Sequence, residues 1–267
     1  MPVFDVMKIK KPIIALLHLR ALPGDPLWRP GDSMKDVVKQ AASDLDNLQR
    51  GDVDAILFSN EFSLPYKNRT DHVTSAAMAR VIGEIKADIS KPYGVDLLLD
   101  PFNIVDLAAA VDASFVREQF TGAFVGEGGI IETDIASTLR RKAALGLHDL
   151  KMFYFLNAEA DAYLNDRDFK AIARSIIFKC VPDGICVSGS QAGSAPDIGI
   201  IEDVKTVTGD TPVLCNTGCN AQNVRQMLSA ADGAFVGTAF KTDGRFENFT
   251  DFNRVREFMD IVNDFRR

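Results

Sequence analysis

The sequence predicts one α/β domain over residues 1–267, folded as a (β/α)8 TIM barrel. Eight short apolar runs recur along the chain, and longer amphipathic segments lie between them. No low-complexity linker or change in composition marks a second domain. In this prediction residues 1–11 form an N-terminal lead-in, and residues 250–267 form a final helix that covers the barrel.

The apolar runs have the composition of strands that are buried on both faces. Most are continuously apolar and rich in β-branched or aromatic residues, as in a parallel sheet covered by helices. In chain order they span 12–19, 54–61, 92–99, 114–120, 150–156, 184–189, 212–218 and 233–240.

The segments between these strands carry helical periodicity and helix-end signals. Ser33 and Asp197 are candidate N-caps, and Gly51 closes the first helix. Strands that alternate with helices predict parallel βαβ units. The predicted helices span 33–51, 74–89, 131–146, 197–209, 221–233 and 250–265.

An open, doubly wound sheet is the alternative fold. Such sheets usually carry a Gly-rich phosphate loop directly after the first strand. Here the chain continues with "HLRALPGDPLW" (18–28), which is not a dinucleotide fingerprint. The barrel is therefore favoured, and no nicotinamide or flavin cofactor is expected.

Charge and hydropathy argue against several classes of partner. The chain has 30 Lys and Arg against 37 Asp and Glu, a net charge of −7, and no basic stripe, so nucleic-acid binding is not expected. No apolar run approaches the roughly 20 residues of a spanning helix, and residues 1–11 lack a signal-peptide core. The sequence predicts a cytoplasmic protein without a membrane span.

Barrel enzymes place their active sites at the C-terminal ends of the strands. His18 ends the first predicted strand, and His72 lies in the loop after the second. His148 precedes the fifth strand and so belongs to the opposite face, where a surface or packing role is expected. His18 is the favoured catalytic histidine.

Strand alternation selects the other candidate catalytic residues. Because a charge that faces the helix layer is costly, charges within the strands should point into the barrel. Arginine suits a carboxylate or an oxyanion, since its planar guanidinium is always charged. The residues expected to carry chemistry or orient the substrate are His18, Glu61, Asp96 and Arg117.

Neighbouring charges leave two interpretations open. Asp96, Arg117 and Lys151 could form an ion network with either a structural or a catalytic role. The carboxylates near strand ends are candidates for proton transfer, although alternation points the last of them outward: Glu61, Asp100 and Glu118. Glu61, Asp96, Asp100 and His18 could bind a divalent ion such as Mg²⁺, but their spacing is not diagnostic. Solvated or paired carboxylates are the favoured interpretation, and no metal is assigned.

Three Gly-rich loops on the same face predict a phosphate site. They are "SGSQAGSAPD" (188–197), "NTGCN" (216–220) and "GTAFKTDG" (237–244), which follow the sixth, seventh and eighth strands. Glycines allow close backbone approach, and helix N-termini supply unpaired N–H donors. The alternative is that the glycines only make tight turns. The predicted phosphate-binding residues are Ser188, Gly189, Asn216, Gly218, Gly237, Thr238 and Lys241.

Four stretches of the chain resemble the BtpA family. They are "PIIALLHLRALPGDP" (12–26), "FVREQFTGAFVGEGGIIETD" (115–134), "DGICVSGSQAGSAPDI" (183–198) and "ADGAFVGTAFKTDG" (231–244). The resemblance runs through nearly the whole chain and implies a phosphate-binding TIM barrel. The family includes a cyanobacterial factor needed for photosystem I accumulation and an enterobacterial homologue from a sugar-transport gene region.

The chain departs from the family pattern on the catalytic face. The departures are "GVDLLLDP" (94–101), "VREQ" (116–119) and "NTGCN" (216–220). They indicate a divergent subgroup whose substrate differs.

Two functions remain open from the sequence. The first is an isomerase, lyase or hydrolase acting on a small phosphorylated compound, such as a sugar phosphate or a nucleotide-like molecule. The second is a non-catalytic assembly or regulatory factor, for which an exposed apolar patch would be diagnostic. The Phe-rich segment 246–265 fits a final helix that could also serve as a homo-oligomer contact.

Overall fold

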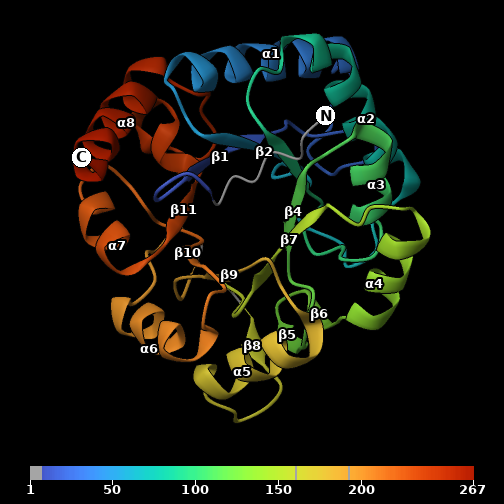
Figure 1. The fold of residues 1–267 in the computed structure, drawn as a ribbon. Coiled ribbons are helices and arrows are strands. Elements are labelled where there is room, and N and C mark those ends of the chain that lie inside the picture. Colours follow the sequence, from blue (N-terminus) through green and yellow to red (C-terminus); the bar gives the residue numbers. More distant parts are fainter. Residues whose placement is uncertain (1–7, 160, 192) are drawn as a thin grey trace.

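The computed structural model is a closed barrel of eight parallel strands inside a ring of helices (Figure 1). It describes residues 8–159, 161–191 and 193–267. The strand order around the barrel is β1-β11-β10-β9-β7-β4-β3-β2, which confirms the predicted fold. The barrel strands are β1 (Ile13–His18), β2 (Ala55–Ser59), β3 (Tyr93–Asp96), β4 (Phe115–Glu118), β7 (Lys151–Phe155), β9 (Gly184–Val187), β10 (Val213–Cys215) and β11 (Gly233–Val236).

The helices follow the strands in turn. Ser33 accepts a hydrogen bond from the Asp36 N–H and Asp197 accepts one from the Gly199 N–H, so both predicted N-caps are confirmed. The α-helices in the described residues are α1 (Met34–Arg50), α2 (His72–Ile85), α3 (Ile104–Val111), α4 (Ile135–Ala144), α5 (Phe169–Cys180), α6 (Ile198–Thr208), α7 (Val224–Ala230) and α8 (Phe252–Arg266). The 3-10 helices are η2 (Lys86–Asp88), η3 (Thr238–Phe240) and η4 (Thr242–Gly244).

The sequence analysis missed two helices and misplaced one histidine. The periodicity did not indicate α3 or α5, because α3 is apolar almost throughout and α5 exposes Phe178 on the face that should be polar. His72 is not in a loop but is the exposed first residue of α2, which Asp71 precedes as the N-cap residue.

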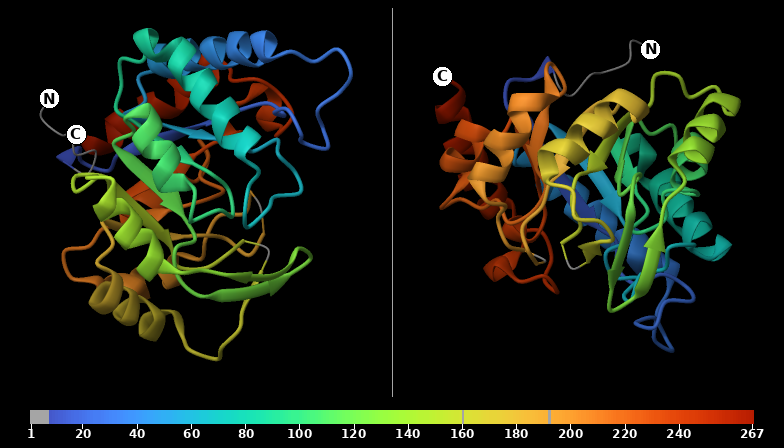
Figure 2. Two further views of the ribbon diagram at one scale, coloured as in Figure 1. Left: turned by 90° about the vertical axis from the view of Figure 1, so that its right-hand side faces the viewer. Right: turned by 90° about the horizontal axis from the view of Figure 1, so that it is seen from below.

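A three-stranded antiparallel sheet lies outside the barrel and was not predicted. Its order is β6-β5-β8, with β5 (Ala123–Gly126), β6 (Gly129–Glu132) and β8 (Ala162–Tyr163). The β5–β6 hairpin extends from the same end of the barrel as the β1–α1 connection (Figure 2). Helix α4 therefore begins after β6, at Ile135, and not at the predicted residue 131.

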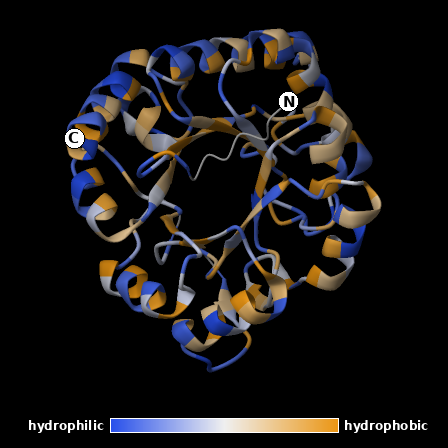
Figure 3. Ribbon diagram, in the orientation of Figure 1, coloured by the Kyte–Doolittle hydropathy of each residue, from blue (hydrophilic) through white to orange (hydrophobic). Residues whose placement is uncertain are grey.

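Strand alternation places an apolar layer inside the barrel. Its members come from seven of the strands: Ile14, Leu16, Ala55, Leu57, Phe115, Phe153, Phe155, Cys186, Leu214 and Phe235. The strands are hydrophobic along their length, whereas the helices mix hydrophobic and hydrophilic residues (Figure 3). Lys151 does not join the predicted network with Asp96 and Arg117, because it starts β7 and its Nζ pairs with Asp183 at 3.0 Å.

The described residues near each end of the sequence contact other parts of the fold. Residues 1–7 of the predicted lead-in are outside the described residues, and Lys11 donates to the carbonyl oxygen of Ala231. Helix α8 buries Val255, Phe258 and Val262. In the part of the chain that the structure describes, no helix combines the length and the apolarity needed to cross a membrane.

Candidate active site

The C-terminal ends of the first four strands bring together the four predicted catalytic residues. His18 ends β1 and pairs in register with Ser59, which pairs with Asp96 of β3. Arg117 lies on β4, and Glu61 follows β2 by two residues. His18, Asp96 and Arg117 are buried, at 7, 0 and 3% exposure. A cluster of polar side chains therefore lies above the apolar layer, at the C-terminal ends of the strands.

Asp96 and Arg117 form a fixed ion pair. The Arg117 Nε and Nη2 atoms donate to one Asp96 oxygen at 2.9 and 2.5 Å, and Nη1 donates to Asn216 Oδ1 at 3.1 Å. The guanidinium lies 5.1 and 5.0 Å from the ring centroids of Phe155 and Phe235. Burial raises the pKa of Asp96, and the charge of Arg117 opposes this. The pair fixes the permanently charged guanidinium of Arg117 at the C-terminal ends of the strands.

His18 and Glu61 form a second, looser pair. Their nearest atoms, His18 Nε2 and Glu61 Oε1, are 3.6 Å apart. The Tyr66 hydroxyl donates to Glu61 Oε2 at 3.1 Å and lies 3.0 Å from the Glu61 carbonyl oxygen. This geometry holds the carboxylate beside the imidazole.

Burial shifts the pKa values of both Glu61 and His18. It raises the pKa of Glu61 to about 7, although the charge of Arg117 opposes the shift. Burial, together with the charges of Lys241 and Arg117, lowers the pKa of His18 well below its usual value. At neutral pH His18 is therefore an uncharged imidazole, and Glu61 can either give or take a proton.

Several buried polar atoms at this end of the barrel have no hydrogen-bond partner among the described residues. Both ring nitrogens of His18 and Asp96 Oδ1 belong to this set, as do Gln119 Nε2 and Thr121 Oγ1. Burying a polar atom without a hydrogen-bond partner costs about 1–3 kcal/mol of folding free energy. Native proteins therefore give most of their buried polar atoms a partner. A cluster of unsatisfied groups is typical of a site that a ligand completes.

Lys241 lies next to this cluster. Its Nζ donates to the carbonyl oxygen of Phe246 at 2.5 Å and lies 5.0 and 4.9 Å from the ring centroids of Phe62 and Phe246. The residue is 4% exposed, and burial lowers its pKa to about 8, with the negative charge of Glu61 opposing the shift. Phe246 also contacts His18, at 5.7 Å between ring centroids.

Two predicted phosphate residues are joined to the catalytic cluster. Asn216 Nδ2 donates to Ser188 Oγ at 2.9 Å, while its Oδ1 accepts from Arg117. Both residues are almost fully buried, at 2% exposure. Asn216 therefore connects the loop after β9 to the ion pair on β3 and β4.

Two of the predicted glycines serve loop packing. A Cβ on Gly218 would lie 2.1 Å from the backbone nitrogen of Ala195, and the residue has a φ of +66°. The Gly189 N–H donates to Thr217 Oγ1 at 3.0 Å, and that hydroxyl donates to the Ser194 carbonyl. The loops after β9 and β10 thus interlock. Thr238 begins η3, directly after Gly237.

Gly237 is close to His18. A Cβ at position 237 would lie 2.6 Å from His18 Nε2. Gly237→Ala should therefore displace the imidazole and cost about 1–3 kcal/mol of unfolding free energy, measured by urea denaturation. Gly83→Ala in α2 is the control, since its Cβ meets nothing within 4 Å and should stabilise the helix. Equal stability of the Gly237→Ala variant and the wild type would contradict the packing.

Two carboxylates proposed for proton transfer have structural partners. Asp100 accepts hydrogen bonds from the N–H groups of Thr70, Phe102 and Asn103 and from two side chains. Glu118 accepts from the N–H groups of Leu99 and Gln119. Both carboxylates are therefore held by neighbouring N–H groups, and burial raises the pKa of Glu118 well above its usual value. Their part in proton transfer stays a prediction.

Four residues of the site were not singled out from the sequence. Asn157 exchanges two hydrogen bonds with the Ser188 backbone, and burial raises the pKa of Glu159. Both follow the fifth predicted strand, 150–156, so the strand-end rule could have found them. Tyr66 and Phe246 lie in loops and carry no periodic signal.

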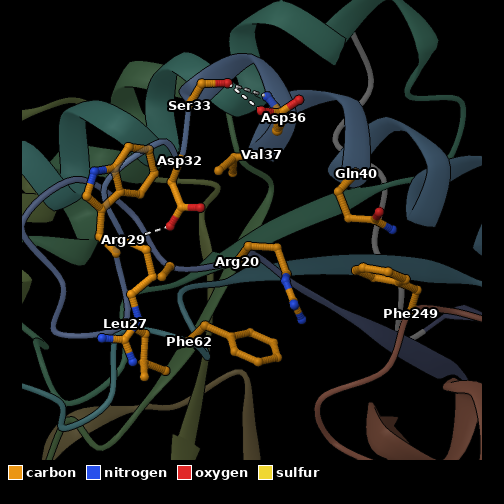
Figure 4. A pocket seen from close by; sticks show the side chains of 12 residues that line it. Arg20, Leu27, Arg29, Asp32, Ser33, Asp36, Val37, Gln40, Phe62 and Phe249 are labelled. Carbon is orange, nitrogen blue, oxygen red and sulfur yellow. Dashed lines mark hydrogen bonds between the residues drawn. The ribbon is translucent and has the colours of Figure 1, made fainter.

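An open pocket of about 490 Å³ adjoins the buried cluster (Figure 4). The Arg20 guanidinium lies between the rings of Phe62 and Phe249, 4.5 and 4.9 Å from their centroids. Phe62 stacks on Phe246 at 4.8 Å. The β1–α1 connection, the start of α1, Phe62 and Phe249 line the pocket. The lining residues are Arg20, Ala21, Leu27, Trp28, Arg29, Asp32, Ser33, Asp36, Val37, Gln40, Phe62 and Phe249.

The carboxylates are poorly placed for a metal ion. Asp96 is paired with Arg117, and Asp100 is saturated by N–H donors. Within residues 8–159, 161–191 and 193–267, no three His, Cys, Asp or Glu side chains are grouped as metal ligands.

The chain shares its fold with an enzyme of known ligand. The (S)-3-O-geranylgeranylglyceryl phosphate synthase from Thermoplasma acidophilum, solved with its substrate sn-glycerol-1-phosphate, superposes with a TM-score of 0.59. The match covers 97% of this chain and 95% of that chain at 16% identity, which bears on the fold alone.

Two relatives match over almost the whole chain. The sgc region protein SgcQ of Escherichia coli (strain K12) is 45% identical, with 98% of each chain covered. The photosystem I biogenesis protein BtpA of Synechocystis sp. is 27% identical, over 98% of this chain and 91% of the relative. The BtpA family model matches residues 9–264. This chain is a member of the BtpA family.

Proposed function

We propose that this protein is an enzyme that transfers protons on a small phosphorylated compound at the C-terminal mouth of the barrel. The observation that carries the proposal is the buried His18–Glu61 pair, 3.6 Å apart, with Glu61 poised near neutrality. A general acid–base is most effective when its pKa lies near the working pH. This is the chemistry of an isomerase, lyase or hydrolase.

Each polar residue has a distinct role in this proposal. Glu61 exchanges a proton with the substrate, and uncharged His18 donates one hydrogen bond, from its single ring N–H, to a substrate oxygen. Asp96 and Asn216 orient Arg117, whose charge stabilises an oxyanion or binds a carboxylate. The loops after β9, β10 and β11 supply the phosphate site, from Ser188, Gly189, Asn216, Gly218, Gly237, Thr238 and Lys241.

A screen for ligands tests the proposal. Thermal unfolding should be measured with phosphorylated metabolites and with their dephosphorylated counterparts. A ligand at 100 times its Kd stabilises the folded state by about 2.7 kcal/mol, which raises Tm by several degrees. We expect a shift with at least one phosphorylated compound and none with its counterpart. Equal shifts within every pair would count against a phosphate site.

A non-catalytic assembly factor is the second candidate function. One observation favours it: Phe178 and Val181, at the end of α5, are 85 and 79% exposed. An apolar surface of this kind suits a protein partner or a second copy of the chain. In contrast, the phenylalanines of α8 do not provide it, since Phe258 is buried against Phe240. Under this alternative, Glu61→Gln would leave function intact.

A further inference from the structure

Two cationic side chains at the C-terminal end of the barrel, Lys241 and Arg20, donate hydrogen bonds to backbone carbonyls of one loop. Lys241 Nζ donates to the carbonyl oxygen of Phe246, and Arg20 Nη1 donates to that of Glu247, at 2.5 and 2.9 Å. Neither cation has a carboxylate within ion-pair distance among the described residues. Backbone carbonyls are weak partners for a buried ammonium and a guanidinium compared with an anion.

The loop that supplies these carbonyls spans residues 241–250. Hydrogen bonds hold its two ends together, and its tip, Phe246–Glu247, lies beside the candidate site. Residues 241 and 250 form a β-bridge, and the Thr242 and Asp251 N–H groups donate to Phe249 and Phe240. The tip carries Phe246, whose ring lies against His18 and Phe62. Phe246 therefore contacts both His18 and Phe62, and Phe62 lines the open pocket.

We propose that Lys241 and Arg20 are the anion-binding pair of this site, and that the phosphate of a small organic ligand displaces the Phe246–Glu247 tip from them. This inference rests on the proposed function and assigns its phosphate to two residues. Arg20 is a phosphate ligand in addition to the residues indicated by the Gly-rich loops.

The adjoining pocket fits the rest of such a ligand. Its volume of about 490 Å³ lies within the range of small-molecule sites, roughly 300–1,000 Å³. Phe62 and Phe249 offer apolar surface beside Arg20, whereas Asp36 lies at the α1 end (Figure 4). Asp36 accepts from Ser33 Oγ, and Asp32 accepts from the Arg29 N–H. The anion belongs at the Arg20 end, away from these carboxylates.

Displacement of the tip also opens the route to the acid–base pair. When Phe246 leaves, His18 loses its ring cover, and Lys241 is released from the carbonyl that now holds it. The ligand then lies between Arg20 and Lys241, with its remaining atoms beside Glu61 and His18. Binding and access are therefore coupled through one loop.

Two signals report on the loop and the pocket. Trp28 is the single tryptophan of the chain and lines the pocket, so its emission should respond to an occupant. Arg245, next to Phe246, has a 66% exposed side chain, so trypsin cleavage after it should speed up when the tip is displaced. The probes are inorganic phosphate and glycerol 3-phosphate, with glycerol and sodium chloride at matched ionic strength as controls.

The experiment compares Lys241→Met and Arg20→Gln with the wild type. Each substitution should weaken binding of both phosphate probes at least tenfold, because a charge-assisted hydrogen bond is lost. Each should also raise the rate of cleavage after Arg245 severalfold without any probe. Arg256→Gln, which removes an exposed charge on α8 outside the pocket, should change both readouts less than twofold. Arg20 is half-buried, so its variant is informative even if Lys241→Met folds poorly.

The outcomes separate this inference from the proposed function. Unchanged phosphate affinity and unchanged cleavage in both variants would overturn the anion pair, and would leave the phosphate to the loops at 188–189 and 216–218. Proton transfer that depends on Glu61 would survive that result. Conversely, a probe that binds through Lys241 and Arg20, without Glu61-dependent chemistry on any ligand, would overturn the proposed function alone.

Discussion

Glu61→Gln should lower turnover of the phosphorylated substrate by about 10²–10⁴-fold while leaving its binding within a few-fold of the wild type. Glutamine keeps the size of the side chain and can still accept from the Tyr66 hydroxyl, but it cannot exchange a proton. The measurement is kcat and KM on the compound that the ligand screen identifies. Glu257→Gln, on the exposed face of α8, is the control and should keep wild-type rates. Undiminished kcat in the Glu61 variant would exclude it as the acid–base group.

The same variant has a stability signature that needs no substrate. The pKa of Glu61 is about 7 in the folded protein, against 4.5 for an unperturbed glutamate in the unfolded chain, so the folded state binds the extra proton between these values. The stability that this proton contributes is present below pH 4.5 and lost as the pH rises through 7. Glu61→Gln should therefore gain about 3 kcal/mol relative to the wild type between roughly pH 4.5 and 8, measured by denaturation at each pH.

Arg117→Met should destabilise the fold by about 3–5 kcal/mol, because it leaves the Asp96 carboxylate buried without its cation. It also removes the partner of Asn216 Oδ1. In a chain of 267 residues this lowers Tm by on the order of 10 °C. Differential scanning calorimetry at pH 7 measures it.

Two further variants test the cause of that loss. Arg256→Met removes one partner of the exposed i,i+4 pair with Asp260, so its effect should stay within about 0.5 kcal/mol. The double variant Asp96→Asn with Arg117→Met removes the buried charge as well and should recover part of the stability. If the double variant were as unstable as the sum of the single variants, the ion pair would not explain the loss.

The barrel could be predicted because burial on both faces leaves a strong signal. A strand such as Ile13–His18 is buried throughout, so it reads as a continuous apolar run. The β5–β6 hairpin has only partly buried strands and was missed. Its two-residue connection between Gly126 and Gly129, with a φ of +95° at Gly129, is nevertheless a typical hairpin signal.

Residues of the candidate site that lie on strands could be predicted from the sequence, whereas those on loops could not. His18, Asp96 and Arg117 could be placed because strand parity and strand ends determine where their side chains point. The neighbours that tune them come from loops whose paths depend on tertiary packing. Tyr66 reaches Glu61 from the loop before α2, and Phe246 reaches His18 from the loop after β11. Asp100 lies near a strand end as expected, yet its carboxylate already accepts hydrogen bonds from the N–H groups of Phe102 and Asn103.

Exchange of solvent deuterium into a bound ligand tests the central claim most directly. The compound selected by the thermal screen is incubated with the wild type in D2O at neutral pH, and its carbon-bound hydrogens are followed by proton NMR. We predict that at least one C–H signal disappears, or that a new product accumulates, and that Glu61→Gln abolishes the effect. A ligand that binds tightly, stays chemically unchanged and gains no deuterium would contradict proton transfer at His18 and Glu61.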